Sequence, residues 1–216
     1  MRPDAPKTMD LILGWAQTYS IASRGGIAPD ANTDMAIGLK LRVAITSSYF
    51  FMVSSALYNI FDPETQGVIK RVHDTGCDIG LHFNYPAYSS KYEHECITEG
   101  LLLERVVPVT AMSVHQPDEE VVNWKKLPWP NSCERRFVNG DFKYFSDASH
   151  QWRWGMPIES KAFEQGENLH ILIHPVWWDE INDTPVRRLE QVAERTKQKA
   201  LRYLRMDCRN VWDQAK

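Results

Sequence analysis

The sequence predicts an α/β fold with a mainly parallel sheet, either open or closed into a barrel. Strand-length apolar runs alternate with segments of helical spacing along its 216 residues, as in strands joined by crossover helices. Three runs end in histidine and a fourth ends in aspartate; these residues are His82, His115, His174 and Asp147. Because the carboxyl ends of parallel strands gather active-site residues, this pattern makes an enzyme the first hypothesis.

Strand character comes from short apolar runs that are rich in β-branched and aromatic residues. The predicted strands are residues 43–53, the runs that end in His82 and His115, residues 142–146, and the run that ends in His174. Residues 1–26 show no clear period and end in two glycines, so we expect an irregular N-terminal segment there.

Helix signals fill the gaps between these strands. Helices are predicted after Pro29, over residues 62–76, 93–106 and 158–165, and from Thr184 onward. Asp62 followed by Pro63 is a typical helix start, and Gly76 is a typical stop. The residues of the 93–106 helix that we expect to face the core are Ile97, Leu101 and Leu102. Several prolines predict a long irregular loop over residues 116–140.

Composition agrees with a globular domain. A chain of this length with 43% hydrophobic residues can bury a full core. Its formal charge of −3 gives no electrostatic case for nucleic acid or an anionic membrane. We find no sign of a signal peptide or a membrane span and therefore expect a cytoplasmic protein. The four cysteines are widely spaced, and we expect them to be reduced.

Each strand-end residue has a catalytic and a structural interpretation. His174, followed by Pro175 and two tryptophans, is either a general acid or a core histidine bonded to a backbone carbonyl. Asp147 either holds that imidazole in one tautomer, as in a hydrolytic triad, or caps the following turn. His82 is either a zinc ligand or a hydrogen-bonded structural residue.

The eight tryptophans are many for this length. Six of them lie beside polar or charged residues; they are Trp124, Trp129, Trp152, Trp154, Trp177 and Trp178. Such residues suit a cleft that stacks on sugar rings, and they equally suit a core or its rim.

Five segments, taken in order, resemble the polysaccharide deacetylase family (NodB homology, carbohydrate esterase family four), especially an outlying prokaryotic branch of it. They are residues 48–51 (SYFF), 78–83 (DIGLHF), 113–117 (SVHQP), 144–148 (YFSDA) with Trp152, and 172–178 (LIHPVWW). The resemblance implies a distorted (β/α) barrel of about seven strands within a single domain over residues 27–216. It also implies a divalent metal, usually zinc, and hydrolytic removal of N-acetyl groups from an amino-sugar glycan or its precursor.

The same resemblance suggests a role for each site residue. His82 matches the first metal histidine, and His174 matches the general acid. Asp147 and Trp152 resemble an Asp/Trp motif beside the site, which makes Asp147 a catalytic candidate. His115 falls where an arginine–proline segment is usual, and it is a substrate-binding candidate together with Trp152 and Trp177.

The sequence departs from the family at the metal ligands. The paired aspartates that end the family's first strand are replaced here by Ser23-Arg24-Gly25-Gly26. The second metal histidine would fall at Pro86, and the branch's acidic residue is Asn84. Three hypotheses therefore stay open: an active deacetylase, an inactive relative that binds a saccharide or a protein, and a truncated product whose barrel is incomplete at the N-terminus.

Overall fold

The structure is a computed structural model. It describes residues 20–25 (backbone only), 47–88, 92–122, 124, 127–177 and 184–214. The chain divides into two units, residues 1–180 and 181–216. The helix expected after Pro29 and residues 43–46 of the first predicted strand lie outside the described residues.

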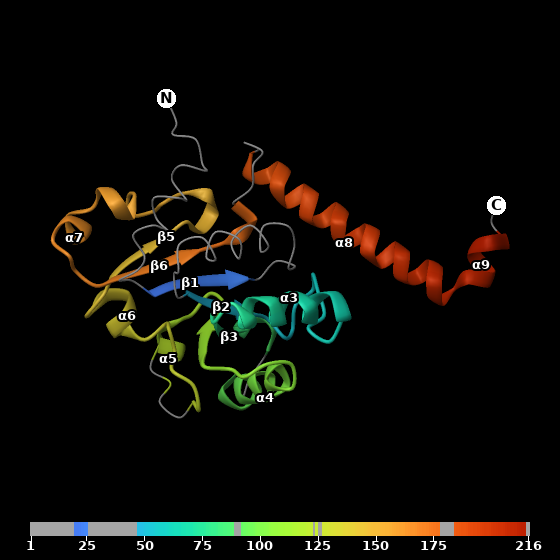
Figure 1. The fold of residues 1–216 in the computed structure, drawn as a ribbon, viewed down its shortest axis with the longest axis horizontal. Coiled ribbons are helices and arrows are strands. Elements are labelled where there is room, and N and C mark those ends of the chain that lie inside the picture. The colour runs from blue at the N-terminus through green and yellow to red at the C-terminus, as the bar shows by residue number, and fades with distance from the viewer. Residues whose placement is uncertain are drawn as a thin grey trace. The chain divides into compact units, whose positions relative to one another are not determined.

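The first unit is built on a parallel sheet of six strands in the order β4-β3-β2-β1-β6-β5 (Figure 1). The strands are β1 (Ser20–Gly25), β2 (Ser47–Phe51), β3 (Asp78–Phe83), β4 (Ala111–Val114), β5 (Lys143–Ser146) and β6 (Leu169–Ile173). All neighbouring pairs run parallel. The prediction of an α/β fold with a mainly parallel sheet is confirmed.

Seven described helices accompany the sheet. They are α3 (Pro63–Asp74), α4 (Tyr92–Glu104), α5 (Glu119–Val122), α6 (Arg135–Asn139), α7 (Lys161–Glu164), α8 (Pro185–Asp207) and α9 (Arg209–Gln214). Short 3-10 turns follow three of the strands; they are η2 (Tyr85–Ala87), η3 (Ala148–His150) and η5 (Pro175–Trp177). A further turn, η4 (Pro157–Glu159), precedes α7. Helices α3 and α4 both contact β3, and α6 contacts β5 (Figure 1). None of the described helices combines the length and apolar character that a membrane span needs.

Strand β1 corrects the expectation of an irregular N-terminal segment. Residues 20–25 carry little local strand signal, but they pair with β2 on one side and β6 on the other. A central strand receives backbone hydrogen bonds from two neighbours, so pairing can override a weak local preference. Tertiary structure therefore decides this strand.

Helix α3 forms where its local signals predict it. Asp62 precedes the helix, Pro63 occupies its first turn, and Gly76 follows it with φ +75°. The proline suits this position because the first helical N–H groups have no intrahelical acceptor. Val68, Ile69 and Val72 are buried, as the spacing predicts, and they pack in the main core against residues of β2, β3 and β4.

Helix α4 buries a different face from the predicted one. Its buried residues are Cys96, Glu99, Gly100 and Leu103, whereas Leu101 is 54% exposed. Apolar residues occur around most of this helix, so spacing alone cannot select the buried face. The deciding contact is long-range: Gly100 leaves room for the indole of Trp129, whose ring a Cβ at position 100 would meet at 2.1 Å.

Glu99 is an acidic residue within this core. It is 3% exposed, and its Oε1 accepts a 2.6 Å hydrogen bond from the Tyr88 hydroxyl. Burial raises the pKa of the Glu99 carboxyl above the ordinary value of a glutamate, and the hydrogen bond from Tyr88 opposes this shift only in part. Burial and the bond to Glu99 also raise the pKa of Tyr88 to about 12.

The raised pKa of Glu99 gives stability a definite pH dependence. Between the unfolded and folded pKa values the folded chain holds a proton that the unfolded chain has lost, so the free energy of unfolding falls as pH rises through this range. We expect Glu99→Gln to remove this fall, because glutamine does not titrate. Below about pH 4 the variant and the unmodified chain should have nearly the same free energy of unfolding, and above that pH the variant should become increasingly the more stable of the two. Denaturant unfolding across pH measures the difference. The exposed Glu164→Gln is the matched control, and identical pH slopes for the unmodified chain and Glu99→Gln would contradict the prediction.

The remaining predictions concern loops, cysteines and the terminal helix. The predicted loop over residues 116–140 contains the short helices α5 and α6.

All four cysteines are free; Cys77, Cys96 and Cys133 are buried, and Cys208 is exposed. The predicted terminal helix begins at its N-cap Thr184, whose hydroxyl accepts from the Arg187 N–H. This helix lies in the second unit of the chain.

Candidate active site

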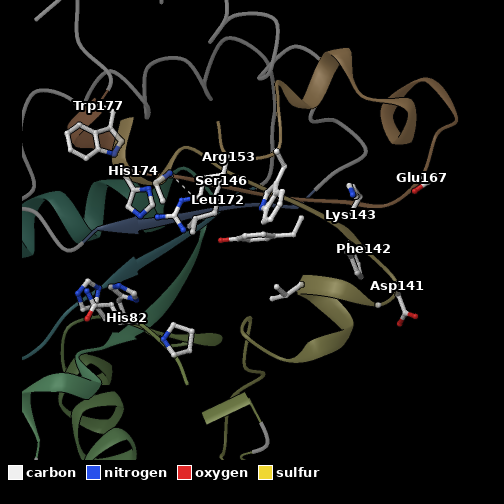
Figure 2. A pocket seen from close by; sticks show the side chains of 18 residues that line it. His82, Asp141, Phe142, Lys143, Ser146, Arg153, Glu167, Leu172, His174 and Trp177 are labelled. Carbon is white, nitrogen blue, oxygen red and sulfur yellow. Dashed lines mark hydrogen bonds between the residues drawn. The ribbon is translucent and has the colours of Figure 1, made fainter. Parts of the chain in front are cut away.

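A pocket of about 810 Å³ is lined by residues of β3, β5 and β6, by the segment that follows β4, and by segments on both sides of β5 and β6. Its residues from the carboxyl ends of strands include His82, Ser146 and His174 (Figure 2). His115, which directly follows β4, also lines it. The predicted convergence of strand-end histidines is therefore present in the first unit. These residues are far apart in sequence, and the parallel sheet brings them to one edge.

Strand alternation explains why His82 faces this pocket. Ile79, Leu81 and Phe83 of β3 lie in the main core, so Gly80 and His82 share the opposite face of the strand. A Cβ at Gly80 would lie 2.4 Å from the Phe50 ring and 2.9 Å from the Ala111 carbonyl oxygen. Glycine thus permits close packing next to His82.

The imidazole of His82 is held by β4. His82 pairs in register with Ser113, and its Nδ1 lies 2.8 Å from the Ser113 Oγ. The His115 ring, which follows the same strand, packs edge-on against His82 at 5.4 Å between centroids. Ser113 is fully buried, so it orients His82 and is not itself a nucleophile that a substrate can reach.

Asp147 and His174 form a carboxylate–imidazole pair. The Asp147 Oδ1 lies 2.6 Å from His174 Nδ1, and both carboxylate oxygens accept the His174 backbone N–H at 3.0 and 3.1 Å. The Asp147 side chain is 5% exposed, whereas that of His174 is 27% exposed and lines the pocket. A carboxylate can only accept hydrogen bonds, so Nδ1 carries the proton and Nε2 is the nitrogen available for chemistry.

The candidate substrate-binding residues are divided. His115 and Trp177 line the pocket, whereas Trp152 is not among the residues that line it. Its neighbours Arg153 and Trp154 do line it, and Trp154 is 65% exposed. Of the other tryptophans that suited a sugar cleft, Trp124 and Trp129 lie in the main core, and Trp178 is outside the described residues.

Two residues of the site carry no sequence signal of their own. They are Ser113, which lies behind the pocket and bonds to His82, and Arg153, which lines the pocket. Strand register could have indicated Ser113, because alternation along β4 puts it beside His82 once the two strands are paired. Arg153 lies in an irregular turn, where no periodicity reports the direction of a side chain.

The described residues do not complete the zinc site that the family resemblance implies. Catalytic zinc usually has three protein ligands. His82 has one other imidazole beside it, that of His115, and within the described ranges no group of three or more His, Cys, Asp or Glu side chains is placed to hold a metal ion. We therefore derive no chemical step through a metal.

Comparison with known proteins adds no assignment: neither a scan against models of protein families nor a search of curated proteins finds a match for this chain. Function must therefore be inferred from the pocket residues and their geometry. The pocket combines an oriented imidazole, a second strand-end histidine and an exposed indole. This combination suits acid–base chemistry on a ligand with polar groups and a ring face.

Proposed function

We propose that this chain is a hydrolase of the polysaccharide deacetylase type, which removes N-acetyl groups from an amino-sugar glycan or its precursor. The observation that carries the proposal is the Asp147–His174 pair at a pocket of about 810 Å³. Pockets of a few hundred Å³ and more take small ligands, and a carboxylate-oriented histidine is a common acid–base group. The family resemblance supplies the substrate class.

The pair can transfer the protons that amide hydrolysis requires. Nε2 of neutral His174 takes a proton from water as the water oxygen adds to the acetamide carbonyl carbon. The imidazolium then gives this proton to the nitrogen as the carbon–nitrogen bond breaks, which releases acetate and the free amine. Asp147 holds the ring by Nδ1 throughout and stabilises its positive charge.

A zinc requirement remains part of this proposal. The resemblance assigns His82 to the metal, and the described residues offer His82 with His115 as nitrogen donors. A bound divalent ion would polarise the acetamide carbonyl and lower the pKa of a bound water. Metal content after mild dialysis, compared between the unmodified chain and His82→Ala, tests the assignment without any assay of activity.

We also propose that the parallel sheet is part of a distorted (β/α) barrel of about seven strands. In the described order β4-β3-β2-β1-β6-β5, neighbouring strands are consecutive in the chain except for β1 and β6, the first and the last. This is the order of a closed ring that is interrupted between the edge strands β4 and β5. The pocket is lined from both sides of this break, by His82 and His115 on one side and Tyr144 and Leu172 on the other. A pocket lined by residues from both ends of this strand order supports a barrel interior.

An inactive saccharide-binding domain is the second candidate. Trp154 is 65% exposed at the pocket, which suits stacking on a sugar ring whether or not the sugar is hydrolysed. Binding followed by tryptophan fluorescence, without turnover, would favour this alternative.

Acetate release from chitooligosaccharides tests the proposed function. We expect release by the purified chain supplied with Zn²⁺ or Co²⁺, above the rate measured for a His174→Ala variant that is purified and assayed in the same way. Acetate that appears equally with both proteins would assign the activity to a contaminant. No release from any oligosaccharide length, at any metal concentration, would reject the proposal.

A further inference from the structure

The charged residues of the pocket are separated by position. Asp141, Lys143 and Glu167 lie at the end of the pocket distant from His174, near the amino ends of β5 and β6 (Figure 2). Arg153 extends into the pocket at the other end, the end of His174 and Trp177 (Figure 2). Two carboxylates therefore accompany the lysine, and the arginine stands apart from both.

The turn that carries Arg153 is tied to the carboxyl end of β5. The Arg153 backbone N–H donates to the Ser146 carbonyl oxygen at 3.3 Å, and Asp147, the next residue, binds His174. This short connection fixes where the arginine side chain starts relative to the acid–base pair. A charged group anchored in this way can act on a substrate that His174 also reaches.

The guanidinium of Arg153 has no hydrogen-bond acceptor or ion-pair partner among the residues that the structure describes, and Arg153 is exposed. Asp147, one of the two carboxylates nearest in the chain, is occupied by His174. Trp177 adds a second donor at this end: its Nε1 is buried without an acceptor in the described part of the chain. This end of the pocket is therefore rich in donors and poor in acceptors.

We infer that Arg153 makes this end of the pocket a subsite for a carboxylate on the substrate, so that the site prefers an acidic saccharide. The inference rests on the proposed function, because it takes the pocket as the substrate site. Arginine binds a carboxylate through paired N–H groups, and charge-assisted bonds of this kind are stronger than neutral ones. Lys143 does not provide an equivalent subsite, since Asp141 and Glu167 share its end of the pocket.

Two sugars that differ only in a carboxylate test this inference. N-acetylglucosamine and its C6-oxidised acid are titrated into the full chain at low ionic strength, and tryptophan fluorescence reports binding. We expect the acid to bind about tenfold more tightly, the order of a net hydrogen bond to a charged group. Arg153→Met should abolish this preference, Arg153→Lys should keep part of it, and the matched control Lys143→Met should keep all of it.

Each outcome has a definite meaning. Equal binding of the two sugars by the unmodified chain, or a preference that survives in Arg153→Met, overturns the subsite. Because Arg153 is exposed, its variants should retain the circular dichroism spectrum of the unmodified chain. Binding requires no turnover, so acid preference without acetate release would reject only the proposed function. Acetate release without acid preference would reject only the subsite.

Discussion

His174→Ala is expected to lower the rate of acetate release by about 100- to 10,000-fold while substrate binding changes little. The size is that of a positioned general acid–base group. Binding should survive because the pocket is lined by many other residues, whereas the variant loses the ring that Asp147 orients and that the proposed mechanism uses to deliver the proton. Asp147→Asn should act in the same direction, since an amide can present a donor to Nδ1 and allow the wrong tautomer.

Two measurements separate this effect from a loss of structure. The exposed His94 lies on α4 and is not among the pocket-lining residues, so His94→Ala should leave the rate of acetate release unchanged. Asp147 also accepts the His174 backbone N–H, so the melting temperature of each variant must be compared with that of the unmodified chain. Unchanged turnover in a folded His174→Ala protein would remove this residue from the mechanism.

Gly100→Ala is expected to destabilise the fold by about 1–3 kcal/mol, the usual size of overpacking in a tight core. A helical glycine replaced by alanine normally gains stability, because alanine has the higher helix propensity. At position 100 the new methyl group would meet three atoms of the Trp129 ring at 2.1 to 2.9 Å. Trp129 is itself 8% exposed, and its Nε1 donates to Glu104, so the ring cannot move away without loss of that bond.

Gly67→Ala is the matched control because it is also a helical glycine, on α3. The nearest atom to its added Cβ is an Arg71 guanidinium nitrogen at 3.8 Å, which is ordinary contact. We therefore expect a gain of about 0.4–1 kcal/mol there. Urea unfolding of both variants measures the two changes, and a gain in stability for Gly100→Ala would show that the core around Trp129 is looser than its contacts indicate.

Some features of the fold could be predicted because their signals are local. Asp62 and Pro63 mark the start of α3, and a glycine in the left-handed region follows its end. Strand β3 is a short apolar run, so its end, and with it the position of His82, can be located from sequence. By contrast, β1 has no comparable local signal, because its stability comes from pairing with β2 and β6.

The α4 helix shows the limit of periodicity. Its buried face contains Glu99 and Gly100, and neither residue type by itself predicts a buried position in a helix. Glu99 is buried where the hydroxyl of Tyr88, in a preceding turn, donates a hydrogen bond to it. Gly100 is buried because the ring of Trp129, in a later loop, packs against it. Both causes lie outside the helix and therefore outside any pattern within it.

The sequence by itself determined the alternation of strands and helices and the placing of His82, His115, Asp147 and His174 at strand ends, because these properties depend on neighbouring residues. Only the tertiary structure decided which of these groups meet. Asp147 and His174 are 27 positions apart and bond because β5 and β6 are parallel neighbours. Ser113 contacts His82, and Arg153 lines the pocket, for the same reason. Strand pairing, and the turns whose position it sets, depend on contacts between residues that are far apart in sequence.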